Sequence, residues 1–296
     1  MKKTWLKNKF AFLMVLPALL FVVIFMIYPL LDAFTMSFFD VKIMGEKIFV
    51  GFNNYKKLLN HNEITLISLK NNIYFSLFTT LGTVVIGMIL AILLDRKIHG
   101  WQAFRILFYL PVTLSSVVVS LLWLRIYSPN GGLLNVILNY IQLPFLEKNW
   151  LGDPNIAIFS IIMVSIWQYS GYTMIFFLAA LQSIPDSLFE AARIDGIRPG
   201  QEIMYISFPL IKPVIIIVVM LQLIFSFKVF DIVWVMSTGG PGYSSSVLGT
   251  YLYTEAFRKF QMGYAQAIAV FMFIIIFSMS LIYLKLARFR EASHEY

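Results

Sequence analysis

The stretch Pro185–Pro213, PDSLFEAARIDGIRPGQEIMYISFPLIKP, is a polar, charged island between two long apolar runs. Its leading proline suits the first turn of a helix, where a missing N–H is tolerated. Gly196 is well placed to end that helix, and residues 198–200, Arg-Pro-Gly, cannot easily continue it. We therefore expect a short helix before Gly196 and a second short helix, at an angle to the first, from Gln201 towards Phe208-Pro209.

On local pattern alone, the island is equally compatible with an amphipathic helix that lies on a bilayer surface. The spacing of Glu190-Ala191-Ala192, Gly196, Ile206 and Phe208-Pro209 is more specific, and it resembles the EAA loop of ABC-importer permeases. That loop usually ends in Leu-Pro, so Phe208 is an apolar departure. The resemblance implies a coupling helix that docks onto a cytoplasmic ATPase subunit. The residues that it assigns to coupling are Glu190, Ala191, Ala192, Asp195 and Gly196.

The composition identifies an integral membrane protein. Of the 296 residues, 59% are hydrophobic and 13% are charged, whereas soluble domains are about a quarter charged. The absence of cysteine excludes disulfides, Cys-ligated metals and thiol nucleophiles. The net charge of +8 does not predict nucleic-acid binding, because the basic residues are scattered over loops and tails, where topology and anionic headgroups explain them.

Six apolar runs are each long enough to cross about 30 Å of hydrocarbon. The first exceeds the apolar region of a secretory signal, so we expect an uncleaved span. The predicted spans are residues 10–31, 73–94, 106–127, 156–181, 204–227 and 264–286. They predict an all-α membrane protein with one domain over residues 10–287, tails at 1–9 and 288–296, and the polar loop at 185–209.

The distribution of Lys and Arg predicts that both termini are cytoplasmic. The N-terminal tail and the short loop Asp95–Arg105 are basic, and short segments beside spans carry the most weight in orientation. Five lysines in the first outer loop, Asp32–Asn72, oppose this orientation. With the termini inside, the loop at 185–209 is also inside, where ATP is found.

The spans lack the residues that would let this chain power transport or catalyse a reaction by itself. A proton- or sodium-coupled carrier usually has ionisable residues in mid-membrane, and these spans have almost none. There is no GxxxxGK[ST] phosphate-binding loop. The three histidines are scattered over loops and a tail, which argues against a metal site and against an intramembrane enzyme. We expect no catalytic residue, no metal and no cofactor in this chain, with ATP and magnesium bound by a partner subunit.

The polar residues of the spans are neutral. Hydroxyls, amides and aromatic faces suit an uncharged, hydroxyl-rich solute, although the same side chains also join helices to one another. Tyr169 and Tyr172 share a helix face, as do Gln222 and Ser226. The candidate cavity residues are Ser116, Gln168, Tyr169, Tyr172, Gln222 and Ser226; the family resemblance points to Ser116, Tyr169, Tyr172 and Ser226 among them.

Two outer-loop motifs extend the resemblance over nearly the whole chain. Gly51-Phe52-Asn53-Asn54-Tyr55, and Gly239-Gly240-Pro241 followed by residues 248–257, are similar to segments of carbohydrate-uptake permeases. The chain is thus identified as a type I ABC-importer permease of a bacterial or archaeal cell membrane, working by alternating access. The resemblance implies four kinds of partner: a second permease, two ATPase subunits, an extracytoplasmic solute-binding protein and a sugar. The alternatives are a permease for a polyol phosphate and, from another class, an ATP-independent channel or facilitator.

Overall fold

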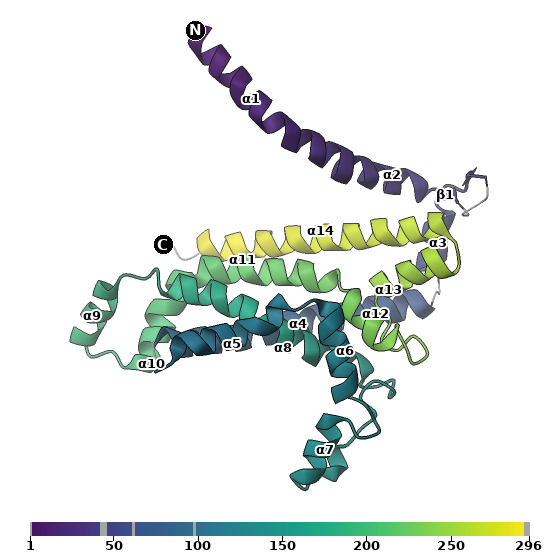
Figure 1. The fold of residues 1–296 in the computed structure, drawn as a ribbon. Helices are drawn as coiled ribbons and strands as arrows, with labels where there is room; N and C mark the ends of the chain where they lie inside the picture. The colour runs from purple at the N-terminus through teal and green to yellow at the C-terminus, as the bar shows by residue number, and fades with distance from the viewer. Residues whose placement is uncertain (1, 42–45, 61–62, 97–98, 293–296) are drawn as a thin grey trace. The chain divides into compact units, whose positions relative to one another are not determined.

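The computed structural model describes residues 2–41, 46–60, 63–96 and 99–292. Most of this part of the chain is helical, as predicted. It divides into two units, residues 1–62 with 252–275 and residues 63–251 with 276–296. By length and composition, five helices could cross a membrane, or six if one bent pair counts as a single span (Figure 1).

The first unit begins with the helix α1 (Lys2–Val22), the π turn η1 (Val23–Ile27) and α2 (Tyr28–Met36). Two short strands, β1 (Phe39–Asp40) and β2 (Ile48–Phe49), pair antiparallel and are the only strands in the described residues. They are followed by α3 (Asn53–Leu59). The unit also contains η4 (Thr254–Arg258) and the first part of α14 (Met262–Ala292). The predicted terminal tails include residues outside the described part, but α1 already begins at Lys2 and α14 continues to Ala292.

The Gly-Phe-Asn-Asn-Tyr motif holds the first unit together. Gly51 has φ +57°, a conformation that suits glycine, and it leads into α3. Asn54 Nδ2 then donates to Ser37 O at 2.8 Å and to Phe39 O at 3.0 Å. The Tyr55 hydroxyl lies 2.7 Å from Ser37 Oγ. The motif therefore fastens α3 to the end of α2 and to β1.

Two π turns precede prolines inside the apolar spans. The turn η1 runs directly into α2, in which Pro29 is the second residue, and η3 (Ile203–Ser207) runs into α11 (Phe208–Phe227), in which Pro209 is the second residue. Proline lacks an N–H and its ring crowds the carbonyl four residues earlier. A π turn widens the helix at that carbonyl. Both spans therefore continue through their prolines.

The second unit is built around α4 (Glu63–Asp95), α8 (Ala157–Leu181) and α11. The pairs α4–α8 and α4–α11 make extensive contacts. Small and hydroxyl side chains allow the close approach, as is usual between helices in lipid. A methyl group on Gly87 would overlap Thr173 on α8, and Thr173 Oγ1 donates to Thr83 O at 2.6 Å.

The third predicted span is wrong in one respect, because it is two helices and not one. The helices α5 (Trp101–Thr113) and α6 (Ser116–Ile126) meet at 98°. Pro111 weakens the end of α5, and Leu114 is extended, with φ −81° and ψ 143°. The Ser115 side chain then accepts from Val117 N at 3.3 Å and begins α6. A second helix thus begins at a serine cap directly after the extended Leu114, with which α5 ends.

The other predicted spans agree with the structure to within a few residues, except that α4 begins ten residues earlier than Ile73. Figure 1 shows two short helices, α9 (Asp186–Ile194) and α10 (Pro199–Glu202), at one end of the second unit. The short helix α12 (Asp231–Ser237) lies near the opposite end. The remaining elements are α7 (Leu133–Tyr140), the 3-10 turn η2 (Pro144–Leu146) and α13 (Leu248–Tyr253).

Two asparagines of α4 anchor the Gly-Gly-Pro loop. Asn71 Nδ2 donates to Ser244 O at 2.7 Å and to Ser246 O at 2.8 Å. Asn72, which has no exposed surface, donates to Phe227 O at 2.7 Å and accepts from Leu248 N at 2.6 Å. The loop contains the cis peptide Gly240-Pro241. Side chains more than 170 residues away in sequence thus hold the conformation of the loop; Asn72 and Leu248, for example, are 176 residues apart.

Candidate functional site

The hairpin of α9 and α10 presents the polar residues singled out from the sequence. Pro185 is the N-cap of α9, in an extended conformation, so α9 begins at Asp186. An acidic residue then lies in the first turn and Arg193 in the last turn, which suits the partial charges at the two ends of a helix. The predicted first helix is confirmed.

Gly196 ends α9 in a left-handed conformation, with φ +80°. Its N–H donates to Arg193 O at 3.1 Å, and Ile197 N donates to Ala192 O at 3.0 Å. These two bonds form a Schellman motif, in which glycine is the usual residue because it has no Cβ. A Cβ at Gly196 would meet nothing within 4 Å. The requirement for glycine therefore comes from the backbone angle and not from crowding.

The second half of the hairpin differs from the prediction. The helix α10 begins at Pro199, two residues before Gln201, and passes through η3 into α11 without a break. Gln201 Oε1 accepts from Arg198 N at 2.9 Å and caps the start of this helix. The separate second helix was expected to stop at Phe208-Pro209, but the π turn accommodates Pro209. The hairpin is therefore one short helix joined by a glycine turn to the extended end of a span.

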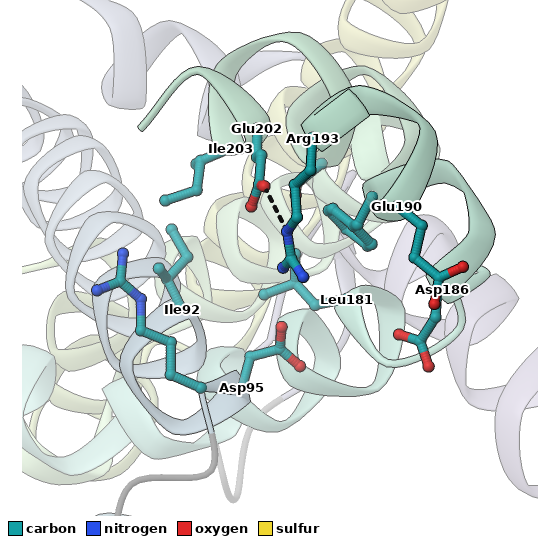
Figure 2. A pocket seen from close by; sticks show the side chains of 11 residues that line it. Ile92, Asp95, Leu181, Asp186, Glu190, Arg193, Glu202 and Ile203 are labelled. Carbon is teal, nitrogen blue, oxygen red and sulfur yellow. Dashed lines mark hydrogen bonds and ion pairs between the residues drawn. The ribbon is translucent and has the colours of Figure 1, made fainter. Parts of the chain in front are cut away.

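An ion pair closes the hairpin. Arg193 Nε lies 3.1 Å from Glu202 Oε1, with side-chain exposures of 66% and 13% (Figure 2). The pair borders a cavity of about 640 Å³ between the hairpin and the end of α4. Its lining residues are Ile92, Asp95, Arg96, Leu181, Asp186, Phe189, Glu190, Arg193, Glu202, Ile203 and Ser207. The lining of this recess combines charges of both signs with apolar side chains, a composition that suits contact with a protein segment.

The five residues predicted for coupling lie on this hairpin. Glu190 lines the recess. Ala191, Asp195 and Gly196 are exposed, while Ala192 faces inward and is buried. Asp95 at the end of α4, Arg96 just after it and Glu202 from α10 were not predicted for the site. The only sequence signal for Asp95 and Arg96 was the charge of the short loop Asp95–Arg105, to which they belong and which was used for orientation alone.

A second cavity, of about 380 Å³, lies between α5, α8 and α11. Three of the predicted solute-contacting residues line it, Tyr169, Tyr172 and Gln222. Ser116 joins them indirectly, because its Oγ lies 2.9 Å from the Tyr169 hydroxyl. The remaining lining residues are Val112, Leu221, Ile224, Phe225 and Lys228. Three of the eight lining residues are aromatic, and the rings of Tyr169 and Phe225 meet edge to face with centroids 5.0 Å apart.

Gln168 and Ser226, also predicted for a cavity, are not among the described residues that line this one. Gln168 is 1% exposed and its Nε2 donates to Leu114 O at 3.2 Å, at the break between α5 and α6. The Ser226 hydroxyl lies between α4 and α11, where it donates to Gln222 O at 2.7 Å and to Ser76 Oγ at 3.2 Å. Both side chains therefore make helix-to-helix contacts in this structure.

Lys228 is the charged residue of the cavity lining. It is the C-cap of α11 and is exposed. The sequence places it near the outer end of the fifth span, where it and Arg125 are the only basic residues on offer to a phosphate, and it was not among the predicted cavity residues. Only the tertiary fold brings it beside Tyr169 and Gln222. Elsewhere in the described part of the chain, no group of three or more His, Asp or Glu side chains is arranged to hold a metal ion.

Comparison with known proteins agrees with this geometry. The family described as binding-protein-dependent transport system inner membrane component matches residues 83–291. The probable ABC transporter permease protein YurN of Bacillus subtilis is 39% identical over 277 residues, 93% of this chain and 94% of that protein. The trehalose/maltose transport system permease protein MalF of Thermococcus litoralis is 31% identical over 291 residues, 98% of this chain and 97% of that protein.

A solved structure has the same fold. In a crystal structure of a bacterial ABC transporter involved in the import of the acidic polysaccharide alginate, one chain superimposes with a TM-score of 0.84 and 25% sequence identity. The superposition covers 97% of each chain.

Proposed function

Because this chain belongs to the binding-protein-dependent transport system inner membrane components, and has the fold of a type I ABC-importer permease, we propose that it carries a sugar or oligosaccharide across a cell membrane. In this proposal both termini and the α9–α10 hairpin face the cytoplasm. A second permease chain completes the pathway, two ATPase subunits supply the energy, and an extracytoplasmic solute-binding protein delivers the solute.

The observation that carries the proposal is the α9–α10 hairpin. It is a charged structure at one end of an otherwise apolar bundle, it is closed by the Gly196 turn and the Arg193–Glu202 pair, and it borders a recess that includes Glu190. The chain has no phosphate-binding loop of its own. An ATPase that grips the hairpin would therefore transmit its closure directly into α11, since η3 joins the two without a break.

Alternating access follows from this connection. Closure of the ATPase pair draws the two coupling hairpins of a permease dimer together, and α11 moves with the hairpin of this chain. The bundles then open outward and receive the solute from the binding protein. Hydrolysis of ATP returns the bundles to the inward-facing state.

The cavity lined by Tyr169, Tyr172 and Gln222 supports a sugar as the solute. Aromatic faces stack on the CH groups of a sugar ring, and phenol and amide groups exchange hydrogen bonds with its hydroxyls. The trehalose/maltose transport system permease protein to which this chain is similar supports the same class. A polyol phosphate is the second candidate, and one observation favours it: Lys228 lies in the cavity lining, where an ammonium group would attract a phosphate.

Coupling is tested in proteoliposomes of the assembled importer. We expect Glu190→Lys and Gly196→Pro to abolish solute-stimulated ATP hydrolysis and uptake while the protein stays in the membrane. Proline requires φ near −65°, and it would also remove the N–H that bonds to Arg193 O. Normal stimulated hydrolysis and uptake in Gly196→Pro would falsify the coupling role. Failure of an ATPase subunit to co-purify with the wild-type chain would instead favour an ATP-independent channel.

The solute is tested separately. We expect the double variant Tyr169→Ala, Tyr172→Ala to lower uptake and leave assembly with the ATPase intact. A thermal-shift screen of the cognate binding protein against neutral oligosaccharides and polyol phosphates identifies the class. If the double variant takes up the identified sugar as fast as the wild type does, the tyrosines only pack the helices.

A further inference from the structure

The helix α7 packs Leu134 against the core of the unit but leaves a stripe of apolar side chains exposed. Residues 133–146, LLNVILNYIQLPFL, include no charged residue. On α7 and its C-cap an exposed stripe follows the i, i+3, i+4, i+7, i+8 spacing of one helix face. Its members, with exposures between 45% and 88%, are Leu133, Val136, Ile137, Tyr140 and Ile141. Phe145, in the turn η2 that follows, is 74% exposed.

One asparagine of α7, Asn135, is buried on the opposite side from the stripe, whereas Asn139 is exposed. Asn135 is 8% exposed, its Oδ1 accepts from Trp150 Nε1 at 2.8 Å, and its Nδ2 donates to Lys148 O at 3.3 Å. Asn139 Nδ2 donates to the Glu147 carboxylate. A helix on a water-exposed surface has the opposite arrangement, with its apolar stripe inward and its polar face in solvent. The stripe is therefore directed towards an apolar environment.

The position of α7 along the spans is set by short connections. Gly132 N donates to Ser128 O at 3.1 Å, so α7 begins immediately beyond the end of α6. Tyr127 precedes α7 in the chain and Trp150 follows it, and their rings stack with centroids 5.9 Å apart. The Tyr127 hydroxyl donates to Ser160 O at 3.2 Å, in the first turn of α8. Thus α7 lies beside the C-terminal end of α6 and the N-terminal end of α8, at the end of the unit away from the α9–α10 hairpin.

We propose that the exposed stripe of α7 lies in the headgroup–acyl boundary of the lipid bilayer and anchors the broken span α5–α6 at that surface. Tyr and Trp are enriched at this depth of a membrane. Interfacial helices bury their apolar face about 5–10 Å into the boundary. Figure 1 shows α7 following α6 away from the packed helices α4, α8 and α11.

Lipid fits the stripe better than a protein partner does. The helix α6, which precedes α7 in the chain, also exposes apolar side chains, among them Val117, Leu121 and Leu122. A protein interface would carry about one hydrogen bond per 100–200 Å². The single polar group on the stripe is the Tyr140 hydroxyl, and a phenol at the edge of an apolar face is the arrangement that suits a headgroup layer.

The test uses spin labels on the assembled importer in nanodiscs of phosphatidylethanolamine and phosphatidylglycerol in equal amounts. The chain has no cysteine, so Ile137→Cys carries a single label. Power saturation compares the accessibility of the label to oxygen, which concentrates in lipid, with its accessibility to a water-soluble nickel chelate. Leu121→Cys on α6 is the matched apolar reference, and Asn130→Cys, in an exposed turn, is the aqueous reference.

We expect the oxygen-to-chelate ratio at position 137 to approach that at position 121 and to exceed clearly that at position 130. A ratio equal to that at position 130 would place the stripe in water and overturn the proposal. Low accessibility to both reagents would show a protein cover, either the second permease or this chain itself. A drop in both values only after the solute-binding protein is added would assign the stripe to that protein, which also overturns the proposal.

Discussion

Gly196 offers the sharpest test of how the hairpin is built, because its environment separates backbone strain from crowding. The residue has φ +80°, and a Cβ there would meet nothing within 4 Å. Any effect of Gly196→Ala therefore comes from holding an L-residue in the left-handed conformation, which costs about 1–2 kcal/mol. Gly200 is the matched control, since it is equally uncrowded but lies in α10 and has no positive φ.

The free-energy difference predicts a measurable loss of order. A penalty of about 1–2 kcal/mol corresponds to a factor of about 5–30 in the equilibrium between the closed and opened turn. The Ile197 amide, which donates to Ala192 O in the wild type, reports that equilibrium by hydrogen exchange. We expect its protection to fall by this factor in Gly196→Ala and to stay unchanged or rise in Gly200→Ala, because alanine favours a helix over glycine.

Further substitutions at the same position refine the test. Asparagine tolerates the left-handed region and should lose the least protection, whereas valine, which is β-branched, should lose the most. If the hairpin transmits ATPase closure, the ratio of solute imported to ATP hydrolysed should fall in the same order. Equal protection in Gly196→Ala and Gly200→Ala, or an asparagine variant as poor as the valine variant, would refute the reasoning from the backbone angle.

Three other perturbations follow from the packing of the second unit. Asn72→Ala leaves two buried backbone groups without their partner, each costing about 1–3 kcal/mol. We therefore expect a lower unfolding temperature of the assembled importer and faster proteolysis of the Gly-Gly-Pro loop. Unchanged proteolysis of the loop would contradict the anchoring role. In Gly171→Ala the new methyl group overlaps a backbone carbonyl of α5, which should destabilise the fold by about 1–3 kcal/mol. In Gly82→Ala the methyl group meets only a side chain that can rotate, so the loss of stability should be smaller. Equal decreases of the unfolding temperature in the two variants would argue against the close α5–α8 contact. Reversal of either charge in the Arg193–Glu202 pair should reduce the hydrogen-exchange protection of the hairpin by the equivalent of about 0.2–1 kcal/mol. The variant with both charges reversed should recover this protection. No recovery would mean that the ion pair does not close the hairpin.

The structure also changes how individual polar residues of the spans are understood. Gln168 and Gln222 both looked like solute contacts in the sequence. Gln222 lines the cavity, whereas Gln168 supplies a donor to the Leu114 carbonyl that the break between α5 and α6 leaves without a helical partner. A buried carbonyl without a donor is costly. A glutamine in a span serves either purpose equally well, and only the position of the neighbouring helix distinguishes them.

The sequence by itself determined the features that depend on a short segment of chain. The length of an apolar run decides whether it can cross a bilayer, and five of the six predicted spans are single helices in the described residues, the third being the bent pair α5–α6. Pro185 and Gly196 likewise set the limits of α9, because the start and stop of a helix depend on neighbouring residues.

The tertiary structure alone decided what depends on distant partners. The 98° bend after Pro111 relies on Gln168, which is 54 residues from the carbonyl that it bonds, and Asn72 fixes a backbone amide 176 residues away. The place of Lys228 beside Tyr169 and the outward stripe of α7 also follow from the packing of whole helices. Apolar spans insert because of their own composition, whereas their angles, breaks and cavities come from contacts that no single segment contains.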